Sequence, residues 1–327
     1  MSFIARILLI ASLLLPYSLA WSWDATGHRL SAYVAWEFLD EDLRSQAITI
    51  LQAHPRYQQD FLDAMPVSAL VGDEAAQARW LFGQAAIWPD LIRNNEIPEN
   101  LQYSRPDWHW IDGRWVRNGI EQGNVYVGLV NLSDIDGERR AQIEAETDAR
   151  NIMTAIDWNL SVLSSRLSTR AEKAVALSWM LHLIGDIHQP LHAGALVSRE
   201  RFPDGDRGGN GIPTAGGNLH AIWDQALRSQ PFDDTLSRLI AASRQTPLST
   251  VILESELWLS ESRSLLQNTV YNEEIKAAVL RSERKNQRLR NLSLDEDYNS
   301  RMRAVAEDRL SSAALRIAAQ LRSSLAK

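Results

Sequence analysis

The amino-acid sequence predicts an all-α protein, built as one mostly helical domain with at most a short β-hairpin. Apolar residues recur at three- and four-residue spacing along most of the 327-residue chain, which is the period of a helix that buries one face. Strand-like alternation occurs only over 124–130, with 115–116 as its candidate partner. No internal repeat or linker-like segment divides 23–327, so we expect a single domain there.

Helical periodicity places the elements in chain order. Leu30, Tyr33 and Val34 indicate the first helix. We expect Pro89 to break the third helix and Pro190 to end the fifth, because proline removes a backbone donor and clashes with the preceding turn. The Gly- and Pro-rich stretch 202–217 is predicted to be a surface loop. The expected helices are 30–38, 43–51, 75–92, 141–167, 171–189, 219–227, 232–243, 249–266, 273–289 and 300–325.

The composition excludes several classes of protein. With 45% hydrophobic and 23% charged residues, the chain is neither disordered nor fibrous. It contains no cysteine, which excludes disulfides, thiolate zinc sites, iron–sulfur clusters and cysteine nucleophiles, so any metal must be held by His, Asp, Glu or backbone groups. The formal net charge of −7 argues against a broad electrostatic grip on duplex nucleic acid. It leaves room for a small cationic site formed around bound metal.

The N-terminal segment is predicted to be a cleaved secretory signal. Arg6 precedes an apolar run over 7–15, which is shorter than the about 20 residues that span a bilayer. Two cleavage sites fit the small-residue pattern, and they leave either Trp21 or Trp23 as the first residue. No later apolar stretch is long enough to cross a membrane, so we expect a soluble processed protein that is secreted or periplasmic.

Two pairs of histidine and aspartate have metal-ligand spacing. His182 and Asp186 interrupt a mostly apolar segment four residues apart, which puts them on one helix face. Alone, this pair fits a buried ion pair as well as a metal site, because a buried carboxylate needs a partner of either kind. His220 and Asp224 repeat the spacing, and imidazole with carboxylate is a ligand set that zinc accepts when thiolates are absent. The repetition favours metal.

Other candidate ligands occur singly. His192 follows Pro190 and can turn back toward the His182 site. Three more residues each fit a helix cap, a turn residue or a partly buried polar group when taken alone. These three are His28, Asp90 and His109.

Taken in order, these segments resemble the zinc-dependent nucleases of the S1/P1 type, found in fungi, plants and bacteria. The most specific matches are Gly-Asp-Ile-His-Gln-Pro-Leu-His at 185–192 and Asn-Leu-His-Ala-Ile-Trp-Asp at 218–224. The remaining matches are the five-residue step from Trp23 to His28, Trp-Pro-Asp at 88–90, Trp-His-Trp-Ile-Asp at 108–112, Gly-Gly-Asn at 208–210 and the closing helix around 314–318.

The resemblance implies a phospholipase C/nuclease-like helical fold with three Zn²⁺ ions. In the family, the tryptophan five residues before the first histidine is the mature N-terminus, which selects cleavage before Trp23. In an uncleaved chain the nitrogen of Trp23 is an amide, and an amide nitrogen cannot replace an α-amine as a metal ligand. By position, one zinc is held by Asp90, His109, His182 and Asp186; a second by Asp186, His28 and the amine and carbonyl of Trp23; and a third by His192, His220 and Asp224.

The resemblance also implies the chemistry. A zinc-activated water attacks the phosphodiester, Asp112 orients that water, and Arg93 stabilises charge on the phosphoryl oxygens. Trp110 offers its ring to a nucleobase, and such stacking requires an unpaired base. The implied substrates are single-stranded DNA, RNA and 3′-nucleotides, the implied products carry 5′-phosphates, and no obligate protein partner is indicated.

Two other functions compete with this interpretation. Zinc-dependent phospholipase C has a similar trinuclear site, but its first histidine lies much further from its N-terminal tryptophan than His28 does from Trp23. A non-catalytic zinc-binding or storage protein usually carries His-rich tracts. In this chain the candidate ligands are dispersed and accompanied by Arg93 and Asp112, which storage does not need.

Several remaining polar residues are predicted to be structural. His188 is interpreted as a supporting group rather than a ligand, and His54, before Pro55, as a surface residue at a helix end. A basic set near the C-terminal third fits a solvated helix face better than a nucleic-acid contact. This set is Arg281, Arg284, Lys285 and Arg288.

Overall fold

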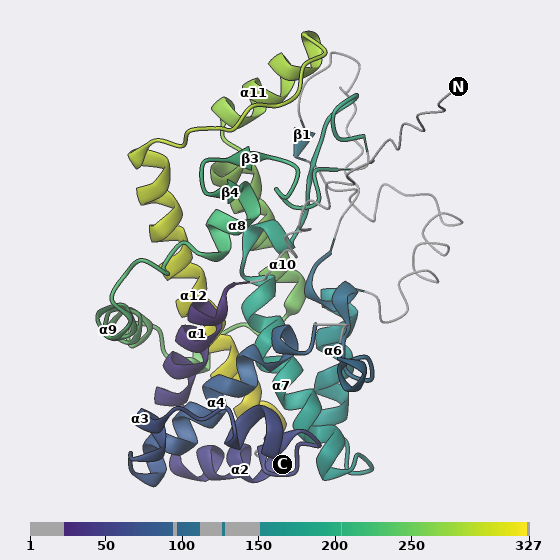
Figure 1. Cartoon of the computed structure of the whole chain (residues 1–327). Coiled ribbons are helices and arrows are strands. Elements are labelled where there is room, and N and C mark those ends of the chain that lie inside the picture. The colour runs from purple at the N-terminus through teal and green to yellow at the C-terminus, as the bar shows by residue number, and fades with distance from the viewer. Residues whose placement is uncertain (1–22, 94–96, 112–125, 128–150, 204, 326–327) are drawn as a thin grey trace, which may run out of the picture.

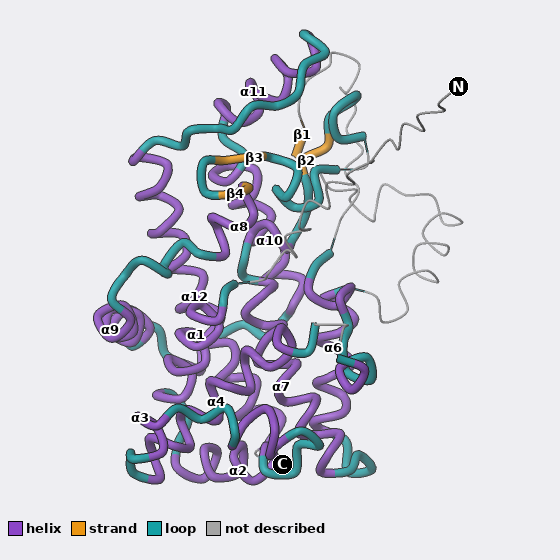
Figure 2. Tube along the Cα trace, in the orientation of Figure 1, coloured by secondary structure: helices purple, strands orange, loops and turns teal. Residues whose placement is uncertain are grey.

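A computed structural model describes residues 23–93, 97–111, 126–127, 151–203 and 205–325, and these are mostly helical (Figures 1 and 2). Within this part of the chain, no helix has both the length and the apolar character needed to cross a membrane. The α-helices are α1 (Ala25–Glu37), α2 (Glu41–Leu51), α3 (Val67–Leu70), α4 (Glu74–Leu91), α6 (Ile152–Ser164), α7 (Arg170–Ile187), α8 (Leu219–Asp224), α9 (Phe232–Ser243), α10 (Ser255–Leu265), α11 (Glu273–Arg284) and α12 (Glu296–Leu325).

Helix α7 lies at the centre of the fold. Its sequence is apolar on nearly all sides after Ala174, which is typical of a helix that is buried all round. A capping box starts it, in which the Thr169 hydroxyl accepts from the Glu172 backbone and the Glu172 carboxylate accepts from the Thr169 backbone. Helices α1, α4, α6 and α12 pack against α7 (Figure 1). Polar residues on α7 are therefore held in the core.

Two short antiparallel sheets complete the described structure. Strand β1 (Tyr126–Val127) lies in the predicted segment 124–130, and it pairs with β2 (Leu196–Val197). The candidate partner 115–116 lies outside the described residues. Strands β3 (Pro213–Thr214) and β4 (Gly217–Asn218) form a hairpin that leads directly into α8.

Proline affects α4 less than the sequence suggests. The predicted break at Pro89 is wrong, because α4 continues through this residue to Leu91. Pro89 occupies the last turn, where the missing backbone donor costs the helix only one terminal hydrogen bond. The helix therefore carries Asp90, which follows the proline, into the buried core.

Other boundaries also differ from the prediction. The helix expected over 141–167 is described only from 151 onward and ends at Ser164. The segment 202–217 is not wholly a surface loop, because Asp206 and Ile212 are buried. The Asp206 carboxylate accepts hydrogen bonds from the Leu196 backbone and the Tyr271 hydroxyl, which ties this loop to the core.

The prediction for His54 is wrong. Its side chain is only 3% exposed and packs edge-on against Trp88, with ring centroids 4.3 Å apart. It does follow a helix end, as expected. The turn after α2 folds this ring inward, and burial lowers its pKa to about 3.

Candidate metal centre

The fold brings together the eight side chains that the sequence singles out as metal ligands. All are buried, with at most 5% of any one exposed. They arrive from α1, α4, α7, α8 and two 3₁₀ turns, Pro106–His109 and Pro190–His192. Three groups have potential ligand atoms within 4.8 Å of one another: His28, Asp90 and His182; His109, His182 and Asp186; and His192, His220 and Asp224.

Four of these side chains point at one spot. His109 Nδ1 lies 2.9 Å from His182 Nε2, and both nitrogens lie 3.1 Å from Asp186 Oδ2. Asp90 Oδ1 lies 3.9 Å from His109 Nδ1 and 3.8 Å from His182 Nε2. Ligand atoms of a tetrahedral zinc with bonds near 2.0 Å are separated by roughly 3.3 Å. The donor set and its spacing therefore fit a zinc ion.

Asp186 connects this cluster to a second one. Its Oδ2 faces His109 and His182, whereas its Oδ1 lies 3.2 Å from His28 Nε2. A carboxylate with its two oxygens in different clusters has the geometry of a bridging ligand. Trp23 is seated beside these residues, because its indole Nε1 donates to the Gly185 carbonyl at 3.0 Å. The first described residue is thereby fixed at the edge of the cluster.

The third cluster forms around α8. The Asn218 side chain caps this helix by accepting from the Ala221 backbone at 2.8 Å, and the helix then holds His220 and Asp224 one turn apart. His220 Nε2 lies 3.5 Å from Asp224 Oδ2, and His192 Nε2 lies 4.0 Å from Asp224 Oδ1. These atoms converge without touching, as ligands do around an ion.

Backbone carbonyls orient three of the rings. Nδ1 of His182 lies 2.8 Å from the Ala86 carbonyl, Nδ1 of His192 lies 2.5 Å from the His109 carbonyl, and Nδ1 of His220 lies 2.5 Å from the Gly208 carbonyl. A carbonyl only accepts, so each Nδ1 carries the hydrogen and each Nε2 presents a lone pair to its cluster. This arrangement is common for histidines that bind metal.

The electrostatics of the centre favour a cation. Burial raises the pKa of Asp224 well above its ordinary value. Burial alone would also raise the pKa of Asp186. The neighbouring histidines have the larger effect, and the pKa of this carboxyl lies well below its ordinary value. The pKa of His182 is lowered by burial and raised by facing carboxylates, with a net rise. Burial lowers the pKa of His109 to about 4, which keeps the ring in the neutral form that binds metal.

Arg93 and Asp112 are the predicted catalytic residues, and Trp110 is the predicted base-stacking residue. Arg93 follows α4, and its Nη1 donates to Asp90 Oδ1 at 3.2 Å. Trp110 is 39% exposed although the preceding His109 is 1% exposed, so its ring is accessible beside the buried cluster. Asp112 lies outside the described residues.

The structure also reveals supporting residues that sequence reasoning missed. Gln189 donates to Asp224 Oδ1 at 2.7 Å and is fully buried. Gly208 adopts a φ of +57°, and a Cβ there would lie 2.3 Å from the Leu191 carbonyl oxygen. Both lie within the quoted motifs, but only the three-dimensional contacts assign them roles. His188 contacts Arg316 at 2.6 Å rather than a cluster, as its predicted structural role requires.

Comparisons with known proteins find two relatives of this chain. Nuclease S1 of Aspergillus oryzae (strain ATCC 42149 / RIB 40) is 28% identical over 211 residues, covering 63% of this chain and 54% of the relative. Endonuclease 4 of Arabidopsis thaliana is 31% identical over 157 residues, covering 45% of this chain and 49% of the relative. The chain thus spans about half the length of these relatives.

A model of one protein family matches the chain far more completely. The S1/P1 nuclease model covers residues 23–326, which includes every candidate ligand described above. The match also begins at Trp23, next to the predicted cleavage site. With clustered histidines and aspartates in the core and a family match over nearly the whole chain, the protein belongs to the S1/P1 nuclease family.

Proposed function

We propose that this protein is an extracytoplasmic, zinc-dependent endonuclease that hydrolyses single-stranded DNA and RNA to 5′-phosphorylated products and also acts on 3′-nucleotides. The observation that carries the proposal is the convergence of eight buried His and Asp side chains, with Asp186 facing two clusters. Family membership supports phosphodiester chemistry at this centre. The names of both relatives describe nucleases.

The proposed centre holds three zinc ions. Asp90, His109, His182 and Asp186 hold the first; Asp186, His28 and the Trp23 terminus hold the second; and His192, His220 and Asp224 hold the third. Bound zinc supplies Lewis-acid activation of water and neutralises phosphate charge. Three separations near 3 Å within the first cluster, and the 3.2 Å separation between Asp186 Oδ1 and His28 Nε2, support this assignment.

The chain's own residues complete the reaction site. Arg93 is anchored on Asp90, and we assign its remaining guanidinium donors to the phosphoryl oxygens of the substrate. The exposed ring of Trp110 stacks on a nucleobase, which favours an unpaired strand. Asp112 orients the attacking water by accepting its hydrogen bond. The enclosed, buried clusters suit one phosphodiester rather than a long duplex.

Metal analysis with parallel substrate assays tests this function. Purified protein is expected to contain zinc and to cleave single-stranded DNA, RNA and 3′-mononucleotides, with loss of all three activities under chelation. Asp186→Asn keeps the side-chain shape but removes the shared charge, so it is expected to lose both metal and activity. Zinc-loaded protein that leaves every nucleic-acid substrate intact would falsify the proposal. Cleavage of phosphatidylcholine alone would instead favour a phospholipase C.

Sequencing the mature N-terminus tests the proposed processing. Export followed by cleavage before Trp23 leaves a free α-amine on the residue whose indole is anchored to the Gly185 carbonyl. We therefore expect Trp23 as the first residue of protein recovered from the periplasm or medium. A mature chain that starts at Trp21 would contradict the assignment of the terminus as a ligand.

A further inference from the structure

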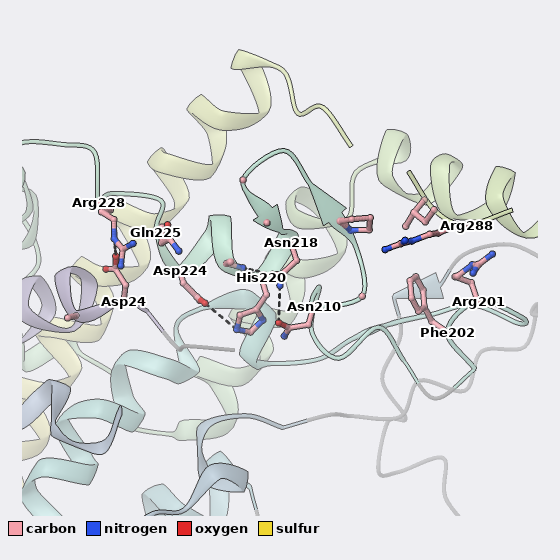
Figure 3. Close-up of a pocket in the computed structure, with 17 residues that line it drawn as sticks. Asp24, Arg201, Phe202, Asn210, Asn218, His220, Asp224, Gln225, Arg228 and Arg288 are labelled. Atoms are coloured by element: carbon pink, nitrogen blue, oxygen red, sulfur yellow. Dashed lines mark hydrogen bonds and ion pairs between the residues drawn. The ribbon is translucent and has the colours of Figure 1, made fainter. Parts of the chain in front are cut away.

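A groove of about 920 Å³ opens on one side of the third cluster. We call it the His220 groove, because His220 and Asp224 lie in the middle of its lining (Figure 3). Asp24 and Arg228 form an ion pair at one end, and Arg201, Phe202 and Arg288 lie at the other (Figure 3). Its volume lies near the upper end of the range for sites that enclose small organic ligands, roughly 300–1,000 Å³.

Arg201 and Arg288 lie at the basic end of the groove, and no described carboxylate forms an ion pair with either one. Arg201 Nη2 donates to the Gln287 carbonyl at 2.5 Å, which fixes the guanidinium on the segment after α11. Arg288 is exposed, and no described carboxylate forms an ion pair with it. By contrast, Arg228 at the other end is held 2.6 Å from Asp24.

A second cavity extends the basic surface beyond Arg288. This α11 cavity, about 290 Å³, is lined by Arg281, Lys285, Arg288 and Arg290. Arg288 and Leu289 line both hollows, so the α11 cavity adjoins the His220 groove along this stretch of chain. Arg284, the other member of the predicted basic set, lines neither hollow. All four members of that set are exposed, as predicted, and three of them also line this cavity.

We propose that the His220 groove and the α11 cavity bind the phosphate backbone of a single-stranded polynucleotide beyond the bond that is cleaved, with Arg201 and Arg288 contacting successive phosphates. Guanidinium groups suit phosphate because they offer several donors in one plane. Phe202 gives the groove an aromatic wall next to Arg201, against which a base packs. This local concentration of cations sits on a chain with a net charge of −7.

The inference rests on the proposed nuclease function and adds a length preference to it. A mononucleotide reaches the metal centre without entering the basic end of the groove, whereas an oligonucleotide occupies both. Arg288→Ala is expected to raise KM for a single-stranded oligonucleotide by about tenfold, since a hydrogen bond to a charged group is lost. The kcat for the oligonucleotide and both constants for a 3′-mononucleotide are expected to stay unchanged.

Salt dependence identifies the lost contact as a phosphate contact. Each phosphate contact on a single strand contributes about 0.7 to the slope of log affinity against log salt. Arg288→Ala is expected to reduce this slope by about 0.7, and Arg201→Ala with Arg288→Ala by about twice that amount. Binding is measured by fluorescence anisotropy with a phosphorothioate oligonucleotide that resists cleavage. Arg284→Ala removes the same charge from α11 outside both hollows, and it is expected to change neither KM nor slope.

The outcomes separate this inference from the proposed function. Wild-type protein that neither binds nor cleaves any nucleic acid overturns both. Active wild-type protein whose oligonucleotide KM and salt slope are the same in Arg288→Ala overturns the groove inference alone. Equal effects of Arg284→Ala and Arg288→Ala also overturn it, because they indicate a general charge effect rather than a built groove.

Discussion

Gln189 donates a hydrogen bond to Asp224 while its own side-chain oxygen accepts from the Leu191 backbone. The amide therefore links the start of one 3₁₀ turn to a carboxylate on α8. Because the bond fixes which Asp224 oxygen faces His192, Gln189 acts as a positioning residue. At the scale of single residues, the candidate centre depends on such contacts as much as on the ligands themselves.

Gln189→Leu is predicted to weaken metal binding at the third cluster. Loss of an outer hydrogen bond to a ligand typically reduces metal affinity by about 10- to 100-fold. The measurement is metal content after competition with a graded series of chelators. Gln84→Leu is the matched control, since Gln84 is also buried and hydrogen-bonded but contacts Arg29 and Asp60 instead. Equal metal loss in both variants would count against a specific role for Gln189.

Gly208→Ala is predicted to disturb the same cluster through the backbone. The new Cβ would collide with the Leu191 carbonyl, so the Gly208 carbonyl would move away from His220 Nδ1. Gly217→Ala also places a side chain at a positive φ, +122°, but its Cβ meets no atom within 4 Å. We expect both variants to lose stability in urea unfolding and only Gly208→Ala to lose metal. Retention of full metal content by Gly208→Ala would contradict this account.

At the scale of elements, partly buried ionic contacts anchor the end of α7. His188 caps this helix, and its Nε2 lies 2.6 Å from Arg316 on α12. Glu261 on α10 accepts from both Arg309 and Arg316. The two arginines and the carboxylate thereby join α10 and α12 to the helix that supplies His182 and Asp186. The end of α7 that carries Asp186 is thus tied to two other helices.

His54 makes the turn after α2 sensitive to acid. Its pKa is about 3 in the folded protein, mainly because of burial, against 6.5 when exposed. The fold thus favours the neutral ring, and the associated stability is fully present above pH 6.5 and lost as the pH falls toward 3. Between pH 7 and pH 5, we expect a loss of about 2 kcal/mol in the free energy of unfolding from this group.

A paired measurement isolates this contribution. His54→Asn keeps a side-chain acceptor for the Arg56 backbone N–H but cannot take up a proton near pH 5. The difference in unfolding free energy between wild type and variant should narrow by about 2 kcal/mol from pH 7 to pH 5, as measured in urea. Protonation of other histidines affects both proteins equally. If the difference in unfolding free energy is the same at pH 7 and pH 5, the pKa of His54 does not change between the folded and unfolded states.

At the scale of the whole molecule, the metal centre fastens together segments that are far apart in the chain. The clusters draw on α1, α4, α7, α8 and both 3₁₀ turns. The chain has no cysteine, so no disulfide shares this role. Bound metal is therefore expected to contribute to folding as well as to chemistry.

Removal of metal is predicted to lower thermal stability substantially. Ions at a thousand times their dissociation constant stabilise by about 4 kcal/mol per site, so chelation should reduce Tm by roughly 10 °C or more. Calorimetry before and after dialysis against chelator measures this shift. Readdition of Zn²⁺ should restore Tm, whereas Mg²⁺ should not, because histidine nitrogens are poor ligands for it. An unchanged Tm after verified metal loss would refute a structural role.

Much of the candidate site could be predicted from the sequence because its most informative patterns lie within single helices. The pairs His182–Asp186 and His220–Asp224 share one helix face at a spacing of four, and helical periodicity places both pairs in buried segments. Fold class follows from the same periodicity. The predictions for Pro89 and His54 are wrong because local sequence rules do not include tertiary packing. Packing allows α4 to continue through Pro89, and it turns the His54 ring inward against Trp88.

The sequence by itself determined the helical class, the two His–Asp pairs and the absence of sulfur chemistry, and its resemblance to a known family supplied the other candidate ligands. The class and the two pairs depend on residue types and on spacing within single elements. Only the tertiary structure decided that Asp186 faces two clusters, that Gln189 and Gly208 support the third, and that Arg288 lines a groove next to it. Such relations join residues far apart in the chain, and their distances are set by how the helices pack.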